Sequence, residues 1–149
     1  MPFQLYAVVA LGGALGTIAR YFTSGLVANA FGETFPWGTL IVNVVGSFIV
    51  GFFWTLTAPD GRLLVSGSTR QFVMTGFCGG FTTFSSFSLQ TMNLMNDGEW
   101  LYAGGNVLFS VALCLVATWL GFLLGAALTS TKGHLNANRR SNNKEHQLN

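Results

Sequence analysis

Long apolar stretches without a charged residue alternate with short polar segments along this chain. Residues 1–19, 34–59, 71–96 and 100–131 contain no Asp, Glu, Lys or Arg. Each run approaches or exceeds the roughly 20 residues that cross the hydrocarbon core of a bilayer. The pattern therefore predicts an all-α membrane protein with four transmembrane helices, at about residues 2–29, 37–57, 71–96 and 100–131.

The composition indicates one membrane domain followed by a polar tail. Only 8% of the 149 residues are charged, whereas soluble domains carry about 25%. From Lys132 onward the chain is polar and rich in Asn, which is typical of a disordered segment. We therefore expect a transmembrane domain at residues 1–131 and a disordered tail at residues 132–149.

The third run contains a polar stretch that a lipid-facing helix does not need, Gly79-Gly80-Phe81-Thr82-Thr83-Phe84-Ser85-Ser86-Phe87-Ser88. Each glycine costs a helix about 1 kcal/mol relative to Ala, so we expect the third helix to break in mid-membrane. A break would free the carbonyls from Gly79 to Thr82 to coordinate a cation. Such backbone is tolerated only where it is buried in protein or lines a wet cavity. The alternative is a Gly/Phe packing seam against another helix.

Three phenylalanines in the same stretch recur at every third position: Phe81, Phe84 and Phe87. An extended or 3₁₀-like backbone would align them. The edge of a Phe ring is electropositive, so it can hold an anion without a full positive charge. Together with the neighbouring hydroxyls, this arrangement favours a path for a small anion.

Polar residues also mark the second and fourth runs. Asn43 lies in the middle of an apolar segment, with Ser47 one turn further on the same face. The alternative for Asn43 is a hydrogen bond across a helix interface, whereas Ser47 on the same face favours a polar path. The fourth run carries a stripe at four-residue spacing, formed by Asn106, Ser110, Cys114 and Thr118. Its hydroxyls can instead bond the carbonyl one turn back, but polar stripes on three helices together favour a shared path.

Charged residues are nearly absent from the predicted spans, and this limits the function. The spans contain no Asp, Glu or His, so they offer no acid–base pair for an enzyme and no carboxylate for a proton-coupled antiporter. Arg20 is the only charge well inside a span. It either extends to the membrane interface or supplies positive potential at the mouth of an anion path.

The first three runs contain three distinct motifs. They are Gly12-Gly13-x-x-Gly16 followed by Arg20, then Gly38-Thr39-Leu40-x-Val42-Asn43-x-x-Gly46, then Gly76-Phe77-Cys78-Gly79-Gly80 continuing to Ser88. Together they resemble the CrcB/Fluc fluoride-channel family. The likeness covers residues 3–128, and the third motif is the most specific of the three.

The resemblance implies an antiparallel, dual-topology dimer of four-helix subunits in the lipid bilayer of the cell inner membrane, with two fluoride paths. It also implies a structural Na⁺ that is not transported, held at the dimer centre by the backbone carbonyls of Gly79 and Thr82. The positions that match the fluoride path of the family are Asn43, Phe84, Phe87, Thr83, Ser85, Ser86, Ser110, Thr118 and Arg20.

Three positions depart from the family pattern. Gln90 stands where many members have Glu, Asn106 where some have Tyr, and Cys114 where some have Ser. The first departure leaves open any role of a charge at that position. The other two leave open which donors the stripe of the fourth helix provides.

The distribution of charge bears on how the chain inserts. The side that holds both termini would carry Arg62, Arg70, Lys132, Arg139, Arg140 and Lys144, whereas the opposite loops carry Glu33, Asp97 and Glu99. The positive-inside rule then predicts cytoplasmic termini, whereas dual insertion needs almost no bias. We favour a homodimer because charges in a long tail count weakly in that rule. A heterodimer with a paired homologue is the alternative.

These observations lead us to expect a fluoride-selective channel that passively exports cytoplasmic fluoride and so lowers its toxicity. We expect neither an enzyme nor a nucleic-acid partner. Two alternatives stay open. A small multidrug-type transporter would need a membrane carboxylate, and a non-conducting membrane scaffold would leave the polar stripes without a role.

Overall fold

Helices form the architecture of the described chain. The computed structural model describes residues 2–148, with side-chain environments for residues 3–130, and within that range it contains no strand. The elements in order are α1 (Pro2–Phe31), α2 (Trp37–Leu56), α3 (Gly67–Gln71), the π-helix η1 (Phe72–Cys78), α4 (Gly79–Phe81), α5 (Phe84–Asn96) and α6 (Trp100–Leu148).

Three of the described helices are long and apolar enough to cross a membrane. They are the 29-residue segment Phe3–Phe31, the 20-residue segment Trp37–Leu56 and the 31-residue segment Trp100–Ser130. They confirm the apolar helices predicted for the first, second and fourth runs. The third run is divided among η1, α4 and α5, and no single described helix in it reaches that length.

Helix α6 is longer than its apolar part. It continues to Leu148, past residue 131, where we expected the helix to end and a disordered tail to begin. Side-chain environments are described only as far as Ser130. The division of the chain into a domain at 1–131 and a tail at 132–149 therefore stays a prediction.

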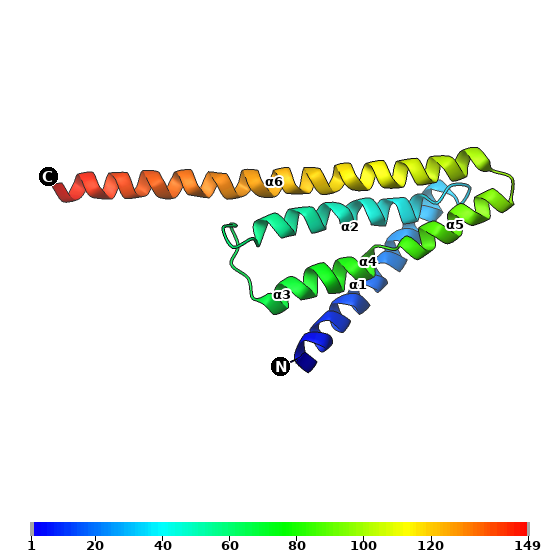
Figure 1. The fold of residues 1–149 in the computed structure, drawn as a ribbon, viewed down its shortest axis with the longest axis horizontal. Coiled ribbons are helices and arrows are strands. Elements are labelled where there is room, and N and C mark those ends of the chain that lie inside the picture. Colours follow the sequence, from blue (N-terminus) through cyan, green and yellow to red (C-terminus); the bar gives the residue numbers. More distant parts are fainter. Residues whose placement is uncertain (1, 149) are drawn as a thin grey trace.

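Helix α2 lies alongside α6 (Figure 1), and glycines allow the two backbones to come close. A Cβ atom added to Gly51 would collide with the carbonyl oxygen of Thr118, and one added to Gly121 with that of Phe48. Any larger residue at these positions would therefore push the helices apart. Gly121 begins the small-residue motif Gly121-x-x-x-Gly125, a pattern that lets helix backbones approach closely.

Helix α1 crosses the segment formed by α3, η1 and α4 (Figure 1), again through glycines. A Cβ atom on Gly12 would lie 2.5 Å from the carbonyl oxygen of Phe72, and one on Gly16 would collide with that of Phe77. The motif Gly12-x-x-x-Gly16 thus brings α1 against the backbone of η1. Sequence periodicity did not reveal η1 itself, because π-helical hydrogen bonding leaves no composition signature.

Most of the outer surface of the bundle is apolar. Large side chains such as Tyr21, at 85% exposed, and Leu101, at 88% exposed, point away from the other described helices. In water such a surface would be unstable, because each apolar Å² exposed costs about 25 cal/mol. The surface is suited to lipid or to another subunit.

Candidate functional site

The helical path of the third run is interrupted at two threonines. α4 ends at Phe81, and both Thr82 (φ −83°, ψ 160°) and Thr83 (φ −154°, ψ 113°) have extended backbone before α5 begins at Phe84. Thr83 caps α5, because its Oγ1 accepts a 3.2 Å hydrogen bond from the backbone N–H of Ser86. The interruption is therefore an ordered element with its own hydrogen bonds.

Asn43 on α2 binds this interruption from the side. Its Nδ2 donates to the carbonyl oxygen of Thr83 at 3.0 Å, and its Oδ1 accepts from the N–H of Thr83 at 2.7 Å. One side chain thus satisfies both backbone groups of a residue that has left the helix. The isolated Asn of the second run therefore has a structural partner 40 residues away.

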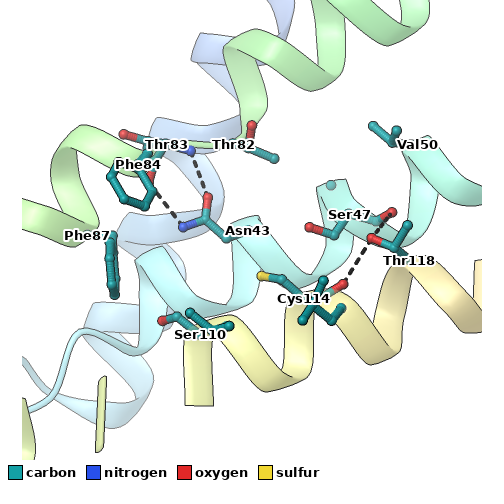
Figure 2. A pocket seen from close by; sticks show the side chains of 13 residues that line it. Asn43, Ser47, Val50, Thr82, Thr83, Phe84, Phe87, Ser110, Cys114 and Thr118 are labelled. Carbon is teal, nitrogen blue, oxygen red and sulfur yellow. Dashed lines mark hydrogen bonds between the residues drawn. The ribbon is translucent and has the colours of Figure 1, made fainter. Parts of the chain in front are cut away.

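A cavity of about 430 Å³ opens beside this contact, between α2, the interruption, α5 and α6 (Figure 2). The amide of Asn43, two aromatic rings and several hydroxyls border it. Six residues predicted for an anion path line it together: Asn43, Thr83, Phe84, Phe87, Ser110 and Thr118. Residues from three separate apolar runs therefore converge on one space.

The two predicted ring positions form a pair at the cavity. The ring centroids of Phe84 and Phe87 lie 5.2 Å apart at an interplanar angle of 46°. Phe87 is 9% exposed, whereas Phe84 is 77% exposed. Phe87 is thus fixed by packing within this chain, and Phe84 faces outward toward lipid or another subunit.

The hydroxyls of the predicted path are not all placed alike. Ser85 and Ser86 are not among the cavity-lining residues; their Oγ atoms lie 3.2 Å and 3.1 Å from Oγ1 of Thr83. They support the lining indirectly through Thr83. Arg20 is half-buried on α1, which provides none of the lining residues.

The stripe on α6 also divides into two parts. Ser110, Cys114 and Thr118 line the cavity, but Asn106 is fully buried and does not. Its Nδ2 donates to Oγ1 of Thr91 on α5 at 2.8 Å, and its Oδ1 accepts from Oγ of Ser110 at 3.4 Å. Asn106 therefore connects α5 to α6. Sequence reasoning did not identify Thr91 as its partner, because the two residues lie on different helices.

No cluster of three or more His, Cys, Asp or Glu that could hold a metal ion occurs among the residues that the structure describes. Backbone carbonyls in this region are candidate cation ligands. In a continuous helix the N–H of Thr83 would bond the carbonyl of Gly79, and the N–H of Ser86 that of Thr82. Here these donors go to Asn43 and to Oγ1 of Thr83. Both carbonyls have lost their usual helical donors.

Comparison with known proteins adds a family to this geometry. The family described as "CrcB-like protein, Camphor Resistance (CrcB)" matches residues 7–122. The chain is 67% identical to the fluoride-specific ion channel FluC of Opitutus terrae over 130 residues, which are 87% of this chain and 98% of that protein.

Two further relatives carry the same name. The protein of Rhodospirillum rubrum is 56% identical over 123 residues, which cover 83% of this chain and 95% of the relative. The protein of Methylocella silvestris is 54% identical over 128 residues, with coverages of 86% and 98%. With a family match across most of its length and relatives this similar, the chain belongs to the CrcB-like family.

Proposed function

We propose that this protein is a fluoride-selective channel that lets fluoride leave the cytoplasm passively and so lowers its toxicity. It is a channel of the inner membrane and not an enzyme. Relatives that align with nearly their full length are named fluoride-specific ion channels, which supports this assignment. The observation within this chain that carries it is the convergence of six predicted path residues on one cavity.

The chemistry of the cavity suits a small, strongly hydrated anion. Fluoride gives up water only where other donors replace it, and the amide of Asn43, the hydroxyls and the edges of Phe84 and Phe87 are such donors. No charged side chain is among the described lining residues. Binding at each step is therefore weak enough for the ion to leave again. Arg20 adds positive potential along the approach to the path.

The segment from Gly67 to Asn96 serves as the fourth membrane span in this proposal. It crosses the bilayer as a helix interrupted at Thr82 and Thr83, which is tolerated because Asn43 satisfies the exposed backbone. Two copies pair in antiparallel orientation, which gives a dual-topology dimer with two fluoride paths. The strongly exposed ring of Phe84 is suited to contact with the second copy. A heterodimer with a paired homologue is the alternative arrangement.

A structural Na⁺ at the dimer centre fits the two freed carbonyls. Backbone oxygens at interrupted helices are ligands that suit Na⁺, and each copy would supply two of them, one from Gly79 and one from Thr82. When bound, the ion would connect the two interrupted segments and add positive potential near the paths. It would not itself be transported.

Fluoride efflux from proteoliposomes tests this function. Wild-type protein should release fluoride and not chloride down a gradient, whereas Phe84→Ile and Phe87→Ile should abolish efflux and leave the dimer intact. Phe122→Ile is a matched control, because Phe122 is an exposed residue of α6 outside the cavity. Chloride efflux at the same rate, or full fluoride efflux in both ring variants, would contradict the proposal. A multidrug-type transporter or an inert scaffold would show no fluoride efflux.

A further inference from the structure

The donors that line the cavity differ in whether they are free to bind an ion. Five lining residues carry a hydroxyl, and four of these hydroxyls already donate within the chain. Their acceptors are the carbonyls of Cys78 and Cys114 at 2.9 Å for Thr82 and Thr118, Oγ of Ser86 at 3.1 Å for Thr83, and Oδ1 of Asn106 at 3.4 Å for Ser110. An anion would have to compete with each of these acceptors.

Ser47 is the fifth hydroxyl, and it differs from the other four. It is half-buried on α2, and its Oγ has no hydrogen-bond partner among the described residues, although Oγ1 of Thr118 donates to its backbone carbonyl at 3.3 Å. Figure 2 shows its hydroxyl pointing toward Asn43, along the wall of the cavity. A hydroxyl in this position can donate to an anion without breaking a bond inside the protein.

The opposite wall explains why a donor is needed at this level. Cys114 occupies the stripe of α6 between Ser110 and Thr118, and it is a free cysteine that lines the cavity. A thiol is a weak donor, whereas a hydroxyl is a strong one. A small anion that leaves Asn43 therefore finds little replacement for water on the α6 side until it reaches Thr118.

We propose that the hydroxyl of Ser47 is a hydrogen-bond donor to the ion in the anion path, at the level where Cys114 leaves the α6 stripe without a strong donor. This inference rests on the proposed function. Fluoride holds its water strongly, so the loss of one donor raises the barrier at that step. Because a hydrogen bond to a charged group is strong, the expected effect of its loss is about tenfold or more in rate.

Fluoride efflux from proteoliposomes that contain Ser47→Ala tests the proposal. We expect efflux at least about tenfold slower than that of wild type. The dimer and the melting temperature should be unchanged, because this hydroxyl makes no hydrogen bond among the described residues. Ser130→Ala is the matched control, since Ser130 is exposed on α6 outside the cavity. It should conduct as wild type does.

A second variant separates a lost donor from a general disturbance. Adding Cys114→Ser to Ser47→Ala places a strong donor on the opposite wall, and we expect it to restore most of the efflux. Wild-type efflux in Ser47→Ala, a loss accompanied by a lower melting temperature, or a loss that Cys114→Ser does not restore would each overturn the inference. If the wild-type protein itself conducts no fluoride, the proposed function fails and the inference falls with it.

Discussion

Replacing Asn43 with Leu tests how far the interruption between α4 and α5 depends on one side chain. The change keeps a side chain of similar size but removes both hydrogen bonds to the backbone of Thr83. Thr83 is only 8% exposed, so water has little access to the groups left behind. An orphaned buried polar group costs about 1–3 kcal/mol. Two of them should lower the free energy of unfolding by about 2–6 kcal/mol.

This expectation is larger than the usual value for polar contacts in membranes. Side-chain hydrogen bonds between membrane helices average about 0.6 kcal/mol, because the separated helices find other partners. The N–H and carbonyl of Thr83 lie outside any helix and have no such substitute. The variant should also lose fluoride efflux by about 10- to 100-fold, because a donor to the ion is gone.

Thermal unfolding in detergent, followed by loss of the monodisperse peak, measures the first effect, and proteoliposome efflux measures the second. Asn29→Leu is the matched control, because Asn29 is an exposed residue of α1 outside the cavity. If Asn43→Leu unfolds at the wild-type temperature and conducts at the wild-type rate, the assigned role of Asn43 is wrong.

Further predictions concern packing, the ion and pH. Asn106→Leu should destabilise the fold by about 1–3 kcal/mol, since Ser110 loses its acceptor in a buried site; thermal unfolding will show this, and an unchanged midpoint would count against it. Gly16→Val should abolish the monodisperse peak in size-exclusion chromatography, whereas Gly104→Ala, which meets nothing within 4 Å, should not; equal behaviour would refute the packing argument. Replacing Na⁺ by a large organic cation on both sides of the membrane should stop fluoride efflux, and unaffected efflux would remove the case for a structural ion. Efflux per free fluoride should stay constant across the neutral pH range, because no carboxylate, imidazole or basic group is among the described lining residues; a steep pH dependence would contradict the cavity assignment.

The sequence was sufficient for the features that depend on a single helix. Absence of charge predicted the three long apolar helices, whereas which backbones the glycines of these helices contact came from the structure. Four-residue spacing placed Ser110 and Thr118 on one face, and both do line the cavity. These properties follow from helical periodicity and from the cost of charge in lipid.

Features that depend on how one helix is rotated against its neighbour could not be predicted from the sequence. Asn106 shares its stripe with Ser110, yet it points at Thr91 on α5 and not into the cavity. In the sequence Ser85 and Ser86 were predicted to line the path as Thr83 does. In the structure they are not among the lining residues and instead contact Oγ1 of Thr83. The rotation of one helix against its neighbour decides such cases. Spacing within one helix carries no information about that rotation.

The crossing of α1 over η1 and α4 has a consequence for biogenesis. α1 precedes the other described helices in the chain and is the least apolar of the three candidate spans. Its main partners follow much later in the chain: the bond from Thr17 to the carbonyl of Gly80 joins residues 63 positions apart. During synthesis α1 therefore enters the bilayer before η1 and α4, the segments that it packs against, have been made. A nascent chain that stops before residue 72 would leave α1 without that surface, so we expect membrane proteases to recognise it.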